Sequence, residues 1–351
     1  MKKIQNRKNK NSSDDELSKD LSNINIQNID TCFVVENVFL PIRLDIYCCG
    51  KLNNFTRSKL KTGIKSIYVN SVKAKLSRQV KNGDFVKLVW ENPIPEYAKP
   101  ENIPVRILYE DENIIVVNKA AGMVTHPAGG NWEGTLVNAL NYYRLFTSHI
   151  TDEFSSLLKF AENAKKDLPD LFRLGIVHRL DKETSGVIIT ARNFKTESFL
   201  KNEFKNRRVK KYYIAILNGE PKEKQAHIKT SVFRSESNRK KFAVSKDLSK
   251  GKIAHSAYRI LKTNGNYSLA VFKIFTGRTH QIRLHSKFIG CPILGDLVYG
   301  KKNKEVCPCG LMLHSYKLII KTDKMQKLKK EFKADIPKNF KQTLKRTGLW
   351  Q

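Results

Sequence analysis

The segment GIVHRLDKETSG, residues 175–186, brings together an imidazole, a guanidinium and a carboxylate within four positions, at His178, Arg179 and Asp181. A carboxylate that a neighbouring cation keeps ionised can act as a nucleophile or as a general base. In an extended chain, Arg179 and Asp181 would project to one face, and His178 and Leu180 to the other. A structural Arg-Asp ion pair on a strand would show the same spacing, so the segment alone does not establish a site.

Three further segments carry side chains of similar kinds. FTGRTHQIRLHSKFIGCPILGDLVYG at 275–300 holds several bases and a Gly-Asp turn, RRVKKYYIAILNG at 207–219 places Lys and Tyr on one strand face, and GLMLHSYKLII at 310–320 is typical of a strand. The side chains concerned are Arg278, His280, Arg283, His285, Lys211, Tyr213, Leu313 and His314. These segments can converge with Asp181 on one cleft, which favours a site over an isolated ion pair.

The elements that must position these side chains are predicted from the apolar pattern. VIITAR after Gly186 is typical of a buried strand, and RILYEDENIIVV predicts a hairpin with strands at 107–109 and 114–117. The strands and helices of this region alternate without the regular rhythm of a βαβ protein. We therefore expect an α+β fold and not a doubly wound parallel sheet.

The charge of the chain points to a polyanionic partner. Its 351 residues include 65 Lys and Arg against 33 Asp and Glu, a net charge of +32, which is typical of proteins that bind nucleic acid. The sequence has no apolar run of about 18 residues and no signal peptide. Its six cysteines are too few for a disulfide scaffold. We expect a cytoplasmic, monomeric protein that binds RNA and not membranes.

Composition divides the chain into five stretches. Residues 1–35 are rich in Asn, Lys, Ser and Asp and have little to bury, which predicts a disordered tail. Residues 36–95 form a compact α+β module, and a proline-rich stretch marks 96–104 as a linker. A large α+β domain follows at 105–320. Residues 321–351 are strongly basic and predict a solvated tail or helix.

The module at 36–95 resembles the S-four-like RNA-binding domain, named after a ribosomal protein of the small subunit. The matching motifs are RLD at 43–45, TRSKL at 56–60, YVN at 68–70 and NGD at 82–84. Between residues 51 and 87 the module carries ten Lys or Arg against one acid. Arg57 and Lys59 lie at a predicted helix start, where backbone amides and the helix dipole add to their attraction for phosphate. For these charges alone, a solvated basic helix face is the alternative.

The motifs beyond the linker are similar to those of RluA-type pseudouridine synthases, some of which carry an S-four-like domain in front. The motifs are HRLDKETSG, VKKYYIAILNG, GRTHQIRLHSKFIGCPILGDLVYG and NKAAGMVTHPAGG. The likeness spans about residues 36–320 and departs from the usual pattern at Ala120 and Leu174, which touch turns. It implies a catalytic domain with a mixed, largely antiparallel sheet and an enzyme that isomerises uridine in RNA.

The same resemblance implies the roles of individual residues. Pseudouridine formation breaks the bond between uracil N1 and ribose, turns the base and rejoins it through C5, so one positioned carboxylate suffices and no cofactor is expected. Asp181 takes this role, either by attacking ribose C1′ or by removing a ribose proton. The further roles are Arg283 as the cation paired with Asp181, Tyr213 as the ring that stacks on uracil, Arg179 as the residue that enters the RNA, Leu313 as an apolar floor, and His178 and Lys211 in the substrate-binding set. Without the motifs, Tyr213, Leu313 and Lys211 would be ordinary strand residues.

Other chemistries fit the sequence less well. CPCG at 307–310 with His314 supplies three ligands at unusual spacing, so we expect no metal site. Asp181 and Glu183 are too close to flank a sugar as a glycosidase pair. An RNA-binding ribosome-assembly protein without turnover remains the alternative to an enzyme. For the enzyme, the domain arrangement implies large-subunit ribosomal RNA as the target, with transfer RNA as the alternative.

Overall fold

The computed structural model of the chain divides into two compact units, Met1–Pro95 and Glu96–Gln351. It describes residues 30–52, 57–90, 98–127, 131–164, 173–235, 241–300, 306–308, 310–320 and 331–350. Most of the tail expected at 1–35 therefore lies outside the described residues. Among the helices of the described part, none has the length and apolar character needed to span a membrane.

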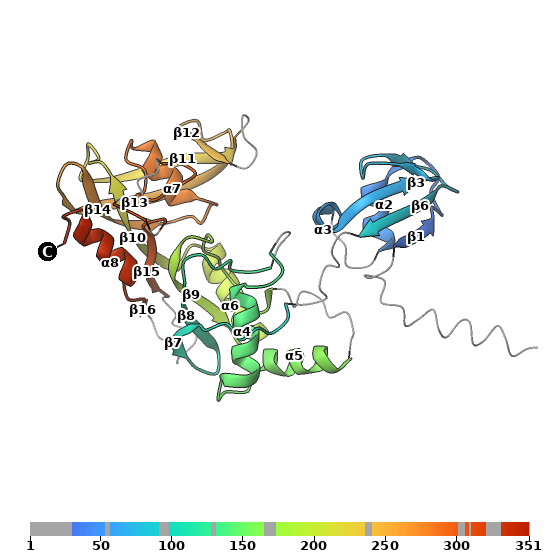
Figure 1. Cartoon of the computed structure of the whole chain (residues 1–351), viewed down its shortest axis with the longest axis horizontal. Coiled ribbons are helices and arrows are strands. Elements are labelled where there is room, and N and C mark those ends of the chain that lie inside the picture. The colour runs from blue at the N-terminus through green and yellow to red at the C-terminus, as the bar shows by residue number, and fades with distance from the viewer. Residues whose placement is uncertain are drawn as a thin grey trace, which may run out of the picture. The chain divides into compact units, whose positions relative to one another are not determined.

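The first unit is a small α+β domain built on a four-stranded antiparallel sheet with the order β1-β6-β3-β4. Its elements (Figure 1) are β1 (Thr31–Val34), β2 (Ile42–Arg43), α2 (Leu44–Lys51), α3 (Arg57–Gly63), β3 (Ile64–Val69), β4 (Val72–Lys73), β5 (Gln79–Val80) and β6 (Phe85–Trp90). Strand β1 precedes residue 36, so this sheet starts earlier than the expected module. A helix does begin at Arg57, as the basic TRSKL motif predicts.

Two motifs of the first unit meet at one carboxylate. Asp84 of NGD accepts hydrogen bonds from the Lys81 backbone N–H at 2.9 Å and from Asn70 Nδ2 of YVN at 2.8 Å. These bonds, the Lys81 bond most of all, lower the pKa of Asp84. Gly83 has a φ of 89°, a conformation that glycine adopts without strain. The two motifs are therefore the two sides of one turn region.

The second unit is built on a ten-stranded sheet with the order β12-β11-β13-β14-β10-β15-β9-β8-β7, in which β16 also pairs with β15. Its strands are β7 (Arg106–Glu110), β8 (Ile114–Lys119), β9 (Ser185–Ala191), β10 (Lys210–Asn218), β11 (Gln225–Arg234), β12 (Phe242–Ser245), β13 (Lys252–Thr263), β14 (Tyr267–Ile274), β15 (Leu313–Ile319) and β16 (Glu331–Lys333). The β9–β15 pair is parallel and the other neighbours are antiparallel. The expected hairpin of β7 and β8 and the mixed, largely antiparallel sheet are confirmed.

Strands β8 and β9 contain continuous apolar runs because both of their faces are buried. Alternate residues of each strand enter two different hydrophobic clusters: Ile115 and Ile188 lie in one, and Val116 and Ile189 in the other. A strand buried on both faces has no polar side to present, so the alternation seen in a half-solvated strand is missing. The VIITAR run is accordingly buried throughout.

Strands β9 and β15 are paired over only two residues each. Ser185 and Gly186 pair with His314 and Ser315, and β16 pairs with β15 farther along. A Cβ at Gly186 would lie 2.2 Å from the Ser315 carbonyl oxygen, and the φ of this residue is 116°. Only glycine permits so close an approach. This sheet junction, Ser185–Gly186 with His314–Ser315, comes directly after the segment that carries Asp181.

Helices cover the sheet, and one of them bonds to the backbone at the start of the second unit. They are α4 (Leu136–Tyr142), the π-helix η1 (Tyr143–Thr147), α5 (Glu153–Ala164), α6 (Phe194–Lys205), α7 (Gln281–Phe288) and α8 (Lys338–Arg346). On α4, Asn138 and Asn141 donate hydrogen bonds to the carbonyls of Lys99 and Ala98, at 2.9 and 2.8 Å. Residues 98 and 99 of the expected linker are thus held against the second unit.

The C-terminal stretch is also part of the second unit. Strand β16 extends the sheet, and Phe340 and Leu344 of α8 are buried in the larger hydrophobic cluster together with Leu349. Phe340 and Leu344 are four residues apart and therefore share one helix face. Of the expected solvated tail or helix, the helix is present as α8, but the face that carries Phe340 and Leu344 is buried and not solvated. Residues 321–330 lie outside the described part.

Candidate active site

Asp181 lies at the end of an irregular, extended segment that leads to the sheet junction. The preceding residue is fixed by Thr125, whose Oγ1 donates to the Leu180 carbonyl at 2.9 Å and accepts from the Leu180 N–H at 3.3 Å. Leu180 is buried, whereas the Asp181 side chain is 21% exposed. The chain thus anchors one residue in the core and presents the next one to solvent, as the expected alternation of faces requires.

A buried lysine fastens the turn that follows Asp181. Lys119, at the end of β8, is only 1% exposed, and its Nζ donates to the carbonyls of Ala120, Met123 and Lys182 at 2.7, 2.8 and 3.1 Å. Burial lowers the pKa of Lys119 to about 8, against the opposing attraction of Asp181. Sequence analysis did not assign this residue, although it belongs to the NKAAGMVTHPAGG motif.

Arg283 on α7 faces Asp181, but its principal partner is a different carboxylate. Its Nε and Nη2 donate to Asp296 at 2.8 and 2.7 Å, and its Nη1 lies 4.0 Å from Asp181 Oδ2. Asp296 also accepts the backbone N–H groups of Val298 and Tyr299. The expected Arg283–Asp181 ion pair is therefore present, but its 4.0 Å separation is the longest that still counts as an ion pair. Asp296, which sequence analysis noted only as part of a Gly-Asp turn, holds the arginine in place.

The buried Arg283–Asp296 pair stays charged. Burial favours the neutral form of each group, but Asp296 and Asp181 outweigh it at Arg283, whose pKa is raised. At Asp296 burial is likewise outweighed, here by the hydrogen bond and charge of Arg283, and the pKa is lowered. The site therefore contains a fixed positive charge next to Asp181.

Tyr213 and Leu313 form one apolar surface near Asp181. In the β10–β15 pairing, Tyr213 lies opposite Ser315 and Ala215 lies opposite Leu313, so these side chains share one face of the sheet. Both Tyr213 and Leu313 are buried members of the larger core cluster. Burial raises the pKa of Tyr213, Ser315 hydrogen-bonds to it, and the charge of Asp181 reaches it. The phenol is therefore neutral and its ring is held rigidly.

His178 and Lys211 lie together around a different ring, that of Phe204. His178 stacks on Phe204 with centroids 4.6 Å apart, and its Nε2 accepts the Ile189 N–H at 3.0 Å. Burial, with a smaller effect of Lys211, lowers the pKa of His178 to about 3, so the imidazole is neutral. Lys211 Nζ lies 5.6 Å from the same ring, and burial lowers its pKa to about 8. The structure gives both residues contacts that support the fold of the Asp181 segment, and a role in substrate binding stays a prediction.

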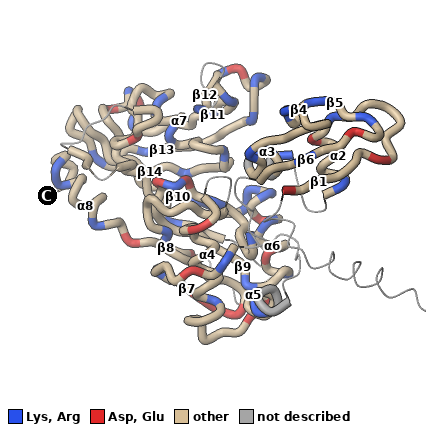
Figure 2. The backbone as a smooth tube through the Cα atoms, turned by 45° about the vertical axis from the view of Figure 1, so that its right-hand side comes forward, with Lys and Arg blue, Asp and Glu red and all other residues tan. Residues whose placement is uncertain are grey.

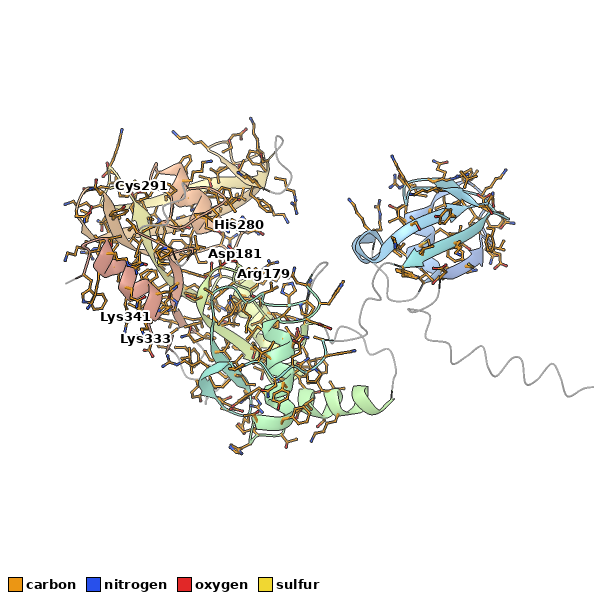
Figure 3. The ribbon with its side chains drawn as sticks, in the orientation of Figure 1. Arg179, Asp181, His280, Cys291, Lys333 and Lys341 are labelled. Carbon is orange, nitrogen blue, oxygen red and sulfur yellow. The ribbon has the colours of Figure 1, made fainter. Side chains whose placement is uncertain are left out.

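His280, which was expected to converge with Asp181 without a specific role, also reaches the site. It has a φ of 55° immediately before α7, and its Nδ1 lies 2.9 Å from Tyr299 Oη. Burial lowers the pKa of His280, while the nearby Asp181 opposes this shift. Figure 3 shows His280 with Asp181 and the exposed Arg179 between β9 and the part of the sheet that α7 covers.

Known proteins share both the sequence and the fold. The RNA pseudouridylate synthase family matches residues 113–287. Ribosomal large subunit pseudouridine synthase D of Borreliella burgdorferi is 42% identical over 305 residues, which cover 85% of this chain and 87% of that protein. The chain belongs to the RNA pseudouridine synthase family. The protein of the same name from Zymomonas mobilis is 37% identical over 75% of this chain and 78% of its own.

Solved structures agree with this membership at the level of the fold. Human RNA Pseudouridylate Synthase Domain Containing 4 superposes with a TM-score of 0.50 at 22% identity, covering 69% of this chain and 93% of the human one. The family match and the two relatives confirm the resemblance to RluA-type enzymes. The synthase is an isomerase that acts on RNA.

Two arginines of the first unit of the synthase share one carboxylate, Asp45. Arg57 donates to Asp45 Oδ2 through Nε and Nη2 at 2.9 and 2.7 Å, and Arg43 donates to both oxygens of Asp45. The hydrogen bond from Arg43 most of all lowers the pKa of Asp45 to about 2. Arg57 is 59% exposed, and Figure 2 shows Lys and Arg along α3 and in β4. The side chain of Lys59 lies outside the described part.

The residues considered for a metal site make other contacts in the synthase. Cys307 Sγ donates to the Gly310 carbonyl at 3.0 Å, and His314 Nδ1 lies 2.9 Å from Ser185 Oγ at the sheet junction. Cys309 is outside the described residues. Within those residues no group of three or more His, Cys, Asp or Glu side chains is arranged to hold a metal ion.

Proposed function

We propose that the synthase converts specific uridines of large-subunit ribosomal RNA to pseudouridine, with Asp181 as the carboxylate that acts on the ribose. The observation that carries this proposal is the placement of Asp181, which lies four residues before the sheet junction, is 21% exposed and is 4.0 Å from Arg283. A fixed cation beside the carboxylate attracts and orients it, and partial exposure lets the carboxylate reach a ligand.

The reaction needs one carboxylate and no net transfer of electrons. The N1–C1′ bond breaks, the uracil turns in the pocket, and a C5–C1′ bond forms. Asp181 either bonds to C1′ and is displaced when C5 attacks, or takes a ribose proton and returns it. In both courses C5 loses its proton and N1 gains one, so substrate and product are isomers.

The apolar face beside Asp181 is suited to hold the extruded base. Tyr213 and Leu313 share that face, and stacking on an aromatic ring is worth roughly 1 to 3 kcal/mol per base. This contribution offsets part of the few kcal/mol needed to take a base out of its stack. Arg179 is exposed and precedes Asp181 by two positions. This placement suits it to enter the RNA where the base has left.

The choice of ribosomal RNA rests on the relatives and on the first unit. The Borreliella burgdorferi and Zymomonas mobilis relatives are both named for the large ribosomal subunit. The exposed Arg57, held by Asp45, is placed to meet phosphate, as a domain that binds structured RNA requires. Transfer RNA is the alternative target.

Mapping of pseudouridines tests this proposal directly. Ribosomal and transfer RNA are compared from a strain that lacks the gene, from the same strain with the wild-type gene restored, and from one with Asp181→Asn. We expect one or a few sites in large-subunit ribosomal RNA to be lost, and to return with the wild-type gene alone. Loss confined to transfer RNA would refute the ribosomal target, and an unchanged map would refute the proposed activity.

A further inference from the structure

Three aromatic rings form an array on the surface of the second unit, outside the site described above. His227 on β11 and His255 on β13 are joined by Nδ1 and Nε2, 2.9 Å apart. Phe275, directly after β14, stacks on His255 with centroids 4.3 Å apart and an angle of 18°. His227 is exposed and the other two rings are half-buried. Phe275 is not among the members of the hydrophobic clusters of the described residues, so core packing does not account for the position of its ring.

Cations surround this ring array. Lys273 Nζ lies 4.9 Å from the centre of the Phe275 ring. The charged groups that act on His255 besides His227 are Lys229 and Arg207, and both side chains are exposed. Proteins that bind single-stranded nucleic acid combine the same two features, stacking rings and a basic border.

The ring array is joined to the active site through the loop before α7. Thr276 Oγ1 accepts the His255 N–H at 2.9 Å and lies 2.6 Å from Oε1 of Gln281, the first residue of α7. The same helix carries Arg283, which faces Asp181. Figure 1 shows α7 beside β11 and β13. Thr230 and Ser256 bond to His285 of α7, so His255 and His227 lie on the other face of the sheet. RNA at Asp181 would therefore reach the array around the sheet edge at Thr276.

We propose that the array of His227, His255 and Phe275 stacks an unpaired base of the substrate RNA where the strand passes around the sheet edge from the target uridine. This inference rests on the proposed function, because it assigns a second base-binding position to the same RNA. A base on the array would contact a π-face, and the phosphates on either side would meet Lys229, Lys273 and Arg207. Such a contact tolerates any base, since every base has a π-face.

The test uses the full chain and a single-stranded oligouridylate of about ten nucleotides that carries one 2-aminopurine. Stacking quenches the fluorescence of this base, so moving it along the oligonucleotide locates the contact. The test variants are Phe275→Leu and His227→Ala, Phe275→Tyr retains the ring, and Phe146→Leu removes an exposed ring elsewhere in the unit. We expect Phe275→Leu and His227→Ala each to weaken binding at least about fivefold and to abolish the quenching. Phe275→Tyr and Phe146→Leu should bind as the wild type does.

The outcomes separate this inference from the proposed function. Wild-type quenching and affinity in both Phe275→Leu and His227→Ala would overturn the ring array as a binding site. If Phe275→Leu fails to fold by circular dichroism, His227→Ala decides, because its side chain is exposed. Equal weakening by Phe146→Leu would also refute a specific platform. The proposed function fails separately, when the wild-type protein forms no pseudouridine in ribosomal RNA.

Discussion

Asp45 in the first unit and Asp296 in the second unit are both nearly buried carboxylates that hold arginine. Asp45 accepts hydrogen bonds from Arg43 and Arg57, whose side chains are 42% and 59% exposed. Asp296 accepts two hydrogen bonds from Arg283, whose side chain is 8% exposed. The first arrangement leaves the cations at the surface, whereas the second buries the cation together with the anion.

The burial of the cation determines what each pair can do. An exposed arginine on a buried carboxylate remains available to a phosphate, and salt screens its charge. A buried arginine acts strongly on the charge next to it, because the surrounding dielectric constant is low. The charge next to Arg283 is Asp181. The same two residue types thus suit RNA binding in one unit and control of a carboxylate in the other.

The largest difference should appear when the buried pair is broken. Asp296→Ala leaves Arg283 buried without its main partner, so the free energy of unfolding should fall by about 3 to 5 kcal/mol, measured by urea denaturation. The matched control is Asp335→Ala, which breaks the exposed pair with Arg106 and should cost less than about 1 kcal/mol. Equal losses in the two variants would show that burial does not separate these pairs.

The anchor behind Asp181 should have the next largest effect. Lys119→Met keeps a long side chain but leaves three carbonyls without their donor, which should cost about 1 to 3 kcal/mol. Because the turn after Asp181 would lose its anchor, kcat for isomerisation should fall more than KM rises. Lys182→Met, an exposed lysine in the same turn, is the control for lost charge. A kcat equal to that of the control would contradict a positioning role for Lys119.

The ion pairs of Asp45 with Arg43 and Arg57 should make the stability of the protein depend on pH. The pKa of Asp45 is about 2 in the folded protein against about 3.9 in an unfolded chain, so its ionised form stabilises the fold. That contribution is present above about pH 3.9 and is lost as the pH falls toward about 2. Urea denaturation of the wild type and Asp45→Asn should therefore show a stability difference that shrinks below about pH 4. A difference that does not change with pH would contradict this account of the pair.

Arg57 should have the smallest effect on stability and a measurable one on RNA. Arg57→Ala removes one candidate phosphate contact, so the slope of log K against log salt should become shallower by about 0.7 to 0.9. The free energy of unfolding should change by less than about 1 kcal/mol, because the side chain is exposed. The measurement is a gel-shift titration at several salt concentrations. An unchanged slope would remove Arg57 from the RNA interface.

Local patterns in the sequence predicted the elements that depend on neighbours along the chain. The hairpin of β7 and β8, the helix beginning at Arg57 and the buried strand β9 all follow from apolar runs and turn residues within a few positions. The long motifs that carry Asp181 and Arg283 predicted that the two residues face each other, and their side chains lie 4.0 Å apart. At the C-terminus the excess of basic residues predicted a solvated segment, whereas Phe340 and Leu344 form an apolar face of α8 among lysines.

Contacts between distant residues were not predictable in this way. Lys119 donates to a carbonyl 63 residues away, and Asp296 pairs with an arginine 13 residues away. No spacing rule within one element leads to either contact, because the fold brings the partners together. The sheet junction is of the same kind, since its two strands are about 130 residues apart.

The central claim is that Asp181 does chemistry that no neighbour can replace. The measurement is tritium release from ribosomal RNA of a strain lacking the enzyme, with purified wild type, Asp181→Asn and the control Glu183→Gln, beside gel-shift titration of the same RNA. Asp181→Asn should retain its fold and RNA affinity but lose at least about a hundredfold in rate, whereas Glu183→Gln should remain active. Pseudouridine formation by Asp181→Asn at the wild-type rate would contradict the account.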